Sequence, residues 1–174
     1  AIESFVDELA RAAGADPVAF RLRYLDDPRA RDVIEAAVAK AGPRPDPPED
    51  PSVARGRGVA YAQYKNRQSY VAVVVDLTVH RESGRIRLER AVLAADSGQI
   101  VSPDGLSNQL EGGFIQAASW TLKEQVTFDA HGVTSLDWRT YPILRIPEAP
   151  IVETVLLDRP GAPFLGVGEG THGP

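Results

Sequence analysis

Five prolines fall among the twelve residues 43–54, PRPDPPEDPSVA, and this run constrains the fold more than any other stretch. Proline fixes its own φ angle and has no backbone N–H, which excludes a helix interior or a central strand here. The run is therefore expected to be an extended linker. It divides the chain into a helical segment over residues 1–42 and a larger region over residues 55–174.

Residues 1–42 carry the pattern of helices. Apolar side chains recur at three- and four-residue spacing at both ends of this segment. An aspartate followed by a proline occurs at Asp16 and again at Asp27, and each pair offers an N-cap with a first-turn proline. The sequence predicts three helices, which end near residues 13, 24 and 41.

The strongest strand pattern lies in residues 69–80. Alternate positions of this stretch form one apolar face, made of Val71, Val73, Val75, Leu77 and Val79. Flanking strands are predicted over residues 56–65 and 85–95, and the second and third strands form an antiparallel hairpin. The apolar positions of the third strand change parity at Arg90, which predicts either a β-bulge or burial of both faces.

Further strands are predicted over residues 124–129 and 151–157. The connector between them contains Trp138, Tyr141 and several prolines, and it is expected to be a long loop packed over the core. The predicted fold class is α+β, with an N-terminal helical segment followed by a mostly antiparallel sheet and one long packed helix.

That long helix is predicted over residues 102–122, with Ser102 as its N-cap. Beside its apolar stripe runs a second stripe at positions i, i+3, i+4 and i+7, made of Gln109, Gly112, Gly113 and Gln116. A glycine inside a helix costs about 1 kcal/mol relative to alanine, so two of them indicate that another group approaches closely. That group is either a neighbouring part of the protein or a ligand.

The last fifteen residues, PGAPFLGVGEGTHGP, combine five glycines, three prolines and one carboxylate. Glu169 lies between Gly168 and Gly170, so no adjacent side chain shields it or pairs with it. A carboxylate on such a loop can act as a general base if a pocket desolvates it and raises its pKa. The other interpretation is a solvated glutamate on a surface turn.

Composition narrows the classes of function. The net charge of −5 leaves no basic excess to hold nucleic acid. No apolar run reaches the roughly 18 residues that a membrane span needs. The chain has no cysteine, which excludes disulfides, cysteine-ligated zinc and iron–sulfur clusters within it.

Four stretches, in this order, carry a family resemblance: IESFVDELARAAGADPVAFRLRYL, VSPDGLSNQLEGGFIQAASWTLKE, SLDWRTYPILRIPEAPIVETVLLDRP and GVGEG. Together they resemble the large subunit of the xanthine dehydrogenase/aldehyde oxidase family of molybdenum hydroxylases. The closest likeness is to the bacterial isoquinoline 1-oxidoreductase beta-subunit type. The resemblance covers nearly the whole chain and implies the C-terminal part of a longer molybdopterin-binding subunit.

The resemblance implies roles for particular residues. Glu169 matches the glutamate of the family's GxGE motif, which is the base beside molybdenum. Gln109 matches the glutamine that hydrogen-bonds the molybdopterin, and Gly112, Gly113 and Gly168 then belong to the cofactor-binding segments. The dithiolene of the pterin holds the metal in this family, so no metal ligand is expected from this chain.

The implied reaction is the oxidation of an aldehyde or an N-heterocycle, with water as the source of oxygen. The implied cofactor is molybdenum on molybdopterin, in the cytosine dinucleotide form, with iron–sulfur clusters only on another subunit or domain. Many family members have a proline after the glutamate, and Gly170 in its place makes this loop more flexible.

The implied partners are the remainder of the large subunit and a small iron–sulfur subunit. The 174-residue chain alone is expected to be inactive, and apolar surface would allow it to self-associate. The location is left open between cytoplasm and periplasm. The alternative function is a non-catalytic structural or subunit-contact module.

Overall fold

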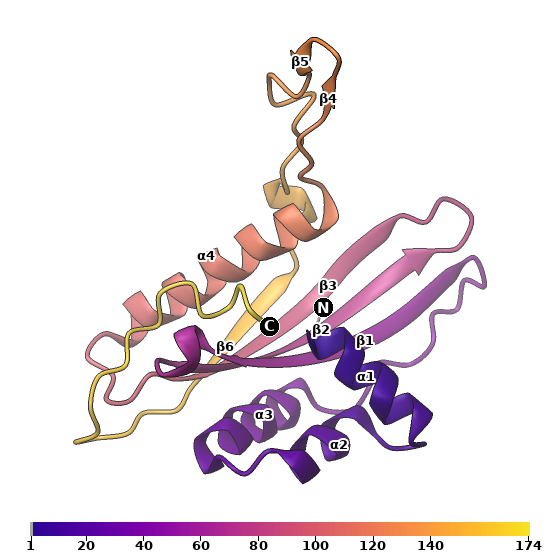
Figure 1. Ribbon diagram of the computed structural model, residues 1–174. Coiled ribbons are helices and arrows are strands. Elements are labelled where there is room, and N and C mark those ends of the chain that lie inside the picture. Colours follow the sequence, from indigo (N-terminus) through magenta and orange to yellow (C-terminus); the bar gives the residue numbers. More distant parts are fainter. Residues whose placement is uncertain (1) are drawn as a thin grey trace.

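The structure is a computed structural model that describes residues 2–174 (Figure 1). Its helices are α1 (Ile2–Ala12), α2 (Pro17–Tyr24), α3 (Pro28–Ala41) and α4 (Pro103–Leu122). Its strands are β1 (Val53–Gln63), β2 (Tyr70–His80), β3 (Ile86–Asp96), β4 (Phe128–Asp129), β5 (Gly132–Val133) and β6 (Ile151–Leu156). Two short 3₁₀ turns span Tyr64–Asn66 and Ile146–Glu148.

The main sheet has the strand order β1-β2-β3-β6. The pairs β1/β2 and β2/β3 are antiparallel, whereas β6 runs parallel to β3, so the sheet is mixed but mostly antiparallel. Helix α3 covers one face of this sheet and α4 lies across the other (Figure 1). The predicted α+β fold class is therefore confirmed.

Strand β2 is buried on both faces, not on the single face that alternation predicted. Val71 and Val73 pack in the core beneath α4, while Ala72 and Val74 pack in the core beneath α3. The physical reason is that the N-terminal helical segment folds back over the sheet, so the intervening positions also need apolar side chains.

The predicted bulge in the third strand is present. Asp76 pairs with Arg90 and Leu77 pairs with Leu88, which leaves Glu89 as the extra residue on β3. Beyond the bulge, from residue 91 to residue 96, every β3 residue is buried. Both alternatives that the parity change allowed therefore occur together.

The helix starts follow the capping residues in the sequence. The side chain of Asp16 accepts hydrogen bonds from the first turn of α2, and Asp27 does the same for α3. Ser102 accepts one from the backbone N–H of Gly105 at 3.3 Å. These contacts satisfy backbone donors that have no partner inside the helix, and a proline follows each cap.

The buried carboxylate of Asp96 connects the helical segment to the end of the chain. It accepts hydrogen bonds from Nε of Arg29 in α3 at 2.9 Å, from Nε of Arg159 at 2.9 Å and from the N–H of Gly98 at 3.0 Å. Burial raises the pKa of Asp96, but the hydrogen bonds from these groups outweigh burial and leave its pKa below the ordinary value. This cluster fixes where the segment after β6 begins.

The segment between α4 and β6 differs from its prediction. Only Phe128–Asp129 is extended and paired, with Gly132–Val133, and the hairpin projects away from the sheet (Figure 1). Leu136 is 80% exposed and Trp138 is 71% exposed. Leu144 packs against the core beneath α4, but most of the other large apolar side chains of the segment stay exposed within residues 2–174.

Candidate cofactor-binding site

The end of the chain runs back along α4 and meets it at Gln109 (Figure 1). The side-chain amide of Gln109 donates a hydrogen bond to the carbonyl oxygen of Gly168 at 2.9 Å. This contact brings together residues from two separate motifs, and it leaves Glu169 next to the helix. Three residues that the sequence singled out, Gln109, Gly168 and Glu169, thus lie at one place.

Gly113 allows the end of the chain to pack directly on α4. A Cβ atom at this position would lie 2.4 Å from Oγ1 of Thr171. That hydroxyl donates to the carbonyl oxygen of Leu110 at 3.1 Å, and Thr171 is buried. The group that approaches Gly113 is therefore the protein's own chain.

Gly112 has a different environment from its neighbour. A Cβ atom added there would meet nothing within 4 Å among the described residues, and the residue is exposed. Packing within residues 2–174 does not account for a glycine at this position. The structure does not bring Gly112 into the cluster around Glu169, and its place in a cofactor site stays a prediction.

Gly168 packs against an aromatic ring, that of Tyr64. Its φ angle is +46°, in the left-handed region that favours glycine, and a Cβ would lie 2.4 Å from Cε1 of Tyr64. The turn before Glu169 thus needs glycine for two reasons, its backbone conformation and the nearness of the tyrosine.

Glu169 is exposed, and its carboxylate has a partner that the sequence did not indicate. The hydroxyl of Tyr64 donates a hydrogen bond to Oε2 of Glu169. This hydrogen bond, with smaller effects of its own backbone N–H, His172 and Lys65, lowers the pKa of Glu169 below its ordinary value. The condition for a raised pKa, desolvation of the carboxylate by a pocket, is not met within residues 2–174, because this side chain is exposed and a donor stabilises its ionised form.

A cavity of about 520 Å³ opens beside this carboxylate. It is lined by Ala62, Gln63, Tyr64, Lys65, Gln116, Trp120, Glu169, Gly170, His172 and Gly173. The rings of Trp120 and His172 meet edge to face, with centroids 4.6 Å apart. The Nε2 atom of His172 is buried, with no hydrogen-bond partner in the described part of the chain. The cavity thus combines one carboxylate, one lysine, amide side chains and aromatic rings.

Sequence reasoning missed Tyr64, Lys65 and His172. Tyr64 lies 105 positions before Glu169, and no spacing rule relates a turn after one strand to a loop so far along the chain. The sequence prediction placed Tyr64 and Lys65 at the end of the strand over residues 56–65, whereas in the structure β1 ends at Gln63 and both residues lie in the 3₁₀ turn Tyr64–Asn66. Short turns of this kind carry many functional side chains.

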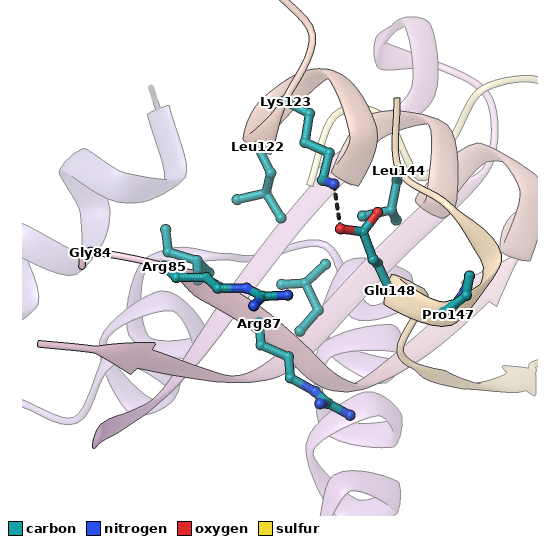
Figure 2. Close-up of a pocket in the computed structure, with 10 residues that line it drawn as sticks. Gly84, Arg85, Arg87, Leu122, Lys123, Leu144, Pro147 and Glu148 are labelled. Carbon is teal, nitrogen blue, oxygen red and sulfur yellow. Dashed lines mark hydrogen bonds and ion pairs between the residues drawn. The ribbon is translucent and has the colours of Figure 1, made fainter. Parts of the chain in front are cut away.

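A second cavity of about 360 Å³ lies between the start of β3 and the end of α4 (Figure 2). Arg85, Arg87 and Lys123 line it, and Lys123 forms an ion pair with Glu148. None of the residues assigned from the sequence lines this cavity. Separately, no helix within residues 2–174 has the length and hydropathy that a membrane crossing requires.

Residues 7–150 match the molybdopterin cofactor-binding domain family. The chain belongs to this family. The match includes Gln109 and ends before the loop that carries Glu169. The chain is thus part of the molybdenum-cofactor-binding region of a molybdenum hydroxylase large subunit, which confirms the family that the four stretches indicated.

Two curated relatives extend the likeness of this molybdopterin cofactor-binding domain over nearly the whole chain. A nicotinate dehydrogenase subunit of Pseudomonas putida is 40% identical over 183 residues, which cover 99% of this chain and 15% of the relative. The isoquinoline 1-oxidoreductase beta subunit of Brevundimonas diminuta is 33% identical over 168 residues, covering 96% of this chain and 21% of the relative. The domain therefore spans about a fifth or less of these relatives.

Two solved structures share the fold of the domain. Quinoline 2-oxidoreductase from Pseudomonas putida 86 superposes with a TM-score of 0.55 and 21% identity, covering 60% of this chain and 14% of that one. Carbon monoxide dehydrogenase from Oligotropha carboxidovorans gives a TM-score of 0.54 at 21% identity, with the same coverage of 60% and 14%. At this level of identity the likeness concerns the fold.

Proposed function

We propose that this chain supplies the general base and part of the cofactor cradle of a molybdenum hydroxylase. Glu169 is the base, and Gln109, Gly112 and Gly168 form the cradle. Gly113 contributes to it by admitting the Thr171 segment, which follows Glu169, against α4. One observation supports this assignment above the others: the amide of Gln109 donates to the carbonyl of Gly168, so two motif residues far apart in sequence meet beside Glu169.

The side chain of Gln109 and the open space at Gly112 are suited to binding a flat, polar pterin ring. The side-chain oxygen of Gln109 accepts no hydrogen bond within residues 2–174, while its amide nitrogen is held by Gly168. An amide fixed in this way offers an acceptor to the polar edge of a heterocycle. Gly112, on the same helix, leaves open space for a flat ring to approach the backbone.

Molybdenum on molybdopterin, when bound, supplies a two-electron oxidation in which an oxygen from water is added to the substrate carbon. Glu169 takes up the proton from that water at one of its carboxylate oxygens. Because its pKa is lowered, the carboxylate is ionised at neutral pH and ready to accept a proton. Trp120 and Tyr64 give the adjoining cavity flat walls, which suit a planar substrate.

The proposed substrates are N-heterocycles and aldehydes. The relatives named for nicotinate and isoquinoline favour the heterocycle, and nicotinate is the first compound to test. The proposed cofactor form is the cytosine dinucleotide, which mass spectrometry of the released cofactor would identify. Electrons leave through iron–sulfur clusters of another subunit or domain, because a chain without cysteine has no ligands for such a cluster.

The test is Glu169→Gln in the complete large subunit, co-expressed with its iron–sulfur partner. Loss of the carboxylate should lower turnover of nicotinate by at least about a hundredfold, since general-base catalysis contributes roughly that much. Molybdenum content should stay at the wild-type level. The matched control is Glu82→Gln, on the exposed turn between β2 and β3, which should keep wild-type turnover.

A non-catalytic structural or subunit-contact role is the second candidate. The observation in its favour is the direct packing of Thr171 on Gly113, which gives this glycine a structural explanation. Under that role the Glu169→Gln enzyme would retain its turnover. Wild-type activity in that variant would therefore replace the catalytic assignment with the structural one.

A further inference from the structure

We infer that Tyr64 is a positioning residue, which holds the carboxylate of Glu169 with its hydroxyl and the turn before it with its ring. This inference rests on the proposed role of Glu169 as the base. It concerns a residue outside the four stretches that identify the family. Two independent contacts carry it.

The first contact is the hydrogen bond to the carboxylate. The hydroxyl of Tyr64 donates to Oε2 of Glu169, and no other side chain among residues 2–174 donates to this carboxylate. One oxygen is therefore fixed while the other stays available for a proton. A carboxylate on a glycine-flanked loop would otherwise rotate among several positions.

The second contact is the packing of the ring on Gly168. Cε1 of Tyr64 lies 2.4 Å from where a Cβ of residue 168 would be, so the ring packs directly against the turn. The same tyrosine thus fixes both the backbone before Glu169 and the end of its side chain. Reacting groups held in this way need less reorganisation before proton transfer.

Tyr64 is itself held in place by the turn that follows β1. Its N–H donates to the carbonyl of Ser69 at 2.8 Å, and its carbonyl accepts from the N–H of Gln68 at 2.9 Å. Lys65 and Asn66 adopt φ angles of 49° and 57°, a conformation that non-glycine residues rarely take. Such strain persists where the surroundings enforce it, often at functional sites.

Three titratable groups face Glu169 in the cavity, and each affects its protonation. The hydroxyl of Tyr64 has the largest effect on the pKa of Glu169. The positive charges of His172, in the same loop as Glu169, and of Lys65, in the turn after β1, have smaller effects. Helix α4 contributes the uncharged side chains of Gln116 and Trp120 to this cavity. Removing the Tyr64 hydroxyl therefore removes the strongest factor that keeps the carboxylate ionised.

The experiment compares Tyr64→Phe with the wild-type large subunit, co-expressed with its iron–sulfur partner and assayed with nicotinate. Phenylalanine keeps the ring against Gly168 and loses only the hydroxyl. We expect kcat to fall roughly tenfold with KM little changed, because the base is displaced rather than lost. The acidic limb of the kcat/KM profile should move to higher pH, since Glu169 without its donor is protonated more readily.

A second readout does not require turnover. Hydrogen exchange of the cofactor-free subunit should be several-fold faster in the peptide over residues 165–173 of Tyr64→Phe, because the loop has lost a tether. Tyr141→Phe is the matched control, since Tyr141 donates the same kind of bond to Glu124 at 2.8 Å elsewhere in the chain. The control should leave both the pH profile and this peptide unchanged.

Two results separate the inference from the proposed function. If Glu169→Gln abolishes turnover while Tyr64→Phe keeps the wild-type acidic limb and the wild-type exchange, the positioning role is overturned and the base assignment stands. If Glu169→Gln keeps its turnover, the base assignment fails, and the positioning role fails with it.

Discussion

Thr171 occupies the space that a side chain at Gly113 would need, with its Oγ1 atom 2.4 Å from where a Cβ would lie. The two glycines in the middle of α4 therefore do different things, although they are adjacent in sequence. Gly113 admits the protein's own chain, and Gly112 faces open space. This difference leads to a matched pair of substitutions.

Gly113→Ala should destabilise the domain by about 1–3 kcal/mol, as overpacking of a tight contact does. Gly112→Ala should stabilise it by up to about 1 kcal/mol, since alanine favours the helix and its Cβ meets no atom of residues 2–174 within 4 Å. Chemical denaturation of both variants measures the difference. If Gly112 lies against the cofactor, the second variant of the complete subunit should also retain less molybdenum. Equal stability of the two variants would contradict the packing described for Thr171.

Gln109→Leu removes the amide at nearly constant size. The variant loses the hydrogen bond to the carbonyl of Gly168, together with the proposed contact to the pterin. One hydrogen bond of this kind corresponds to about a tenfold change in affinity. We expect a matching loss of molybdenum and pterin from the complete subunit after gel filtration, measured by elemental and cofactor analysis. Gln125→Leu, at an exposed position just beyond α4, is the control and should retain both.

Asp96→Asn leaves Arg29 without its carboxylate partner and leaves Arg159 with Asp32 alone. Removing one partner of a buried ion pair costs about 3 kcal/mol, so the free energy of unfolding should fall by that amount. Asp26→Asn, at an exposed position that forms no ion pair with any described residue, should have little effect. A destabilisation of similar size in both variants would argue against a special role of the Asp96 cluster.

The pH dependence of stability follows from the same carboxylate. The folded pKa of Asp96 lies below its ordinary value of 3.8, so its stabilisation is fully present above that pH. It is lost as the pH falls below 3.8 towards the folded pKa. Unfolding free energies measured between about pH 6 and pH 3 should fall less steeply in Asp96→Asn than in the wild type. Parallel curves for the two proteins would contradict this assignment.

The projecting segment around β4 and β5 presents apolar side chains that no core covers within residues 2–174. These include Leu136 and Trp138, and Ile146, in the 3₁₀ turn before β6, is 93% exposed as well. We expect the isolated 174-residue chain to self-associate through this surface. Trp138→Ser combined with Ile146→Ser should reduce the sedimentation coefficient at high concentration, whereas Arg139→Ser, also highly exposed, should not.

The elements that the sequence predicted well are those with local signals. Caps and periodicity located α1 to α4, and alternation located β1, β2, β3 and β6. The predicted strand over residues 124–129 was mostly wrong, since only Phe128–Asp129 finds a pairing partner, in the two-residue strand β5, and the stretch does not join the main sheet. Burial of both faces of β2 depended on α3 folding back across the proline run, which is a tertiary event.

The residues of the candidate site also fall into those that local sequence motifs indicated and those that only the fold brings there. Gln109 and Glu169 were assigned from motifs of the family that the chain resembles, and in the structure Gln109 contacts Gly168, the neighbour of Glu169. Tyr64 was not found, because its partnership with Glu169 arises from the fold rather than from any spacing. The lowered pKa of Glu169 follows from that same contact, and so it could not be predicted either.

The anchoring of Asp96 also has a consequence for how the chain folds during its synthesis. Arg29 precedes Asp96 by 67 positions and Arg159 follows it by 63. A chain that emerges from the ribosome with its N-terminus first can dock α3 on the hairpin of β2 and β3 while Arg159 has yet to be made. The carboxylate then holds only one of its two cations, and its second is supplied by the residues that lead into the Glu169 loop. Within this domain, the segment that leads into the Glu169 loop is thus secured only after the hairpin beneath it can have formed.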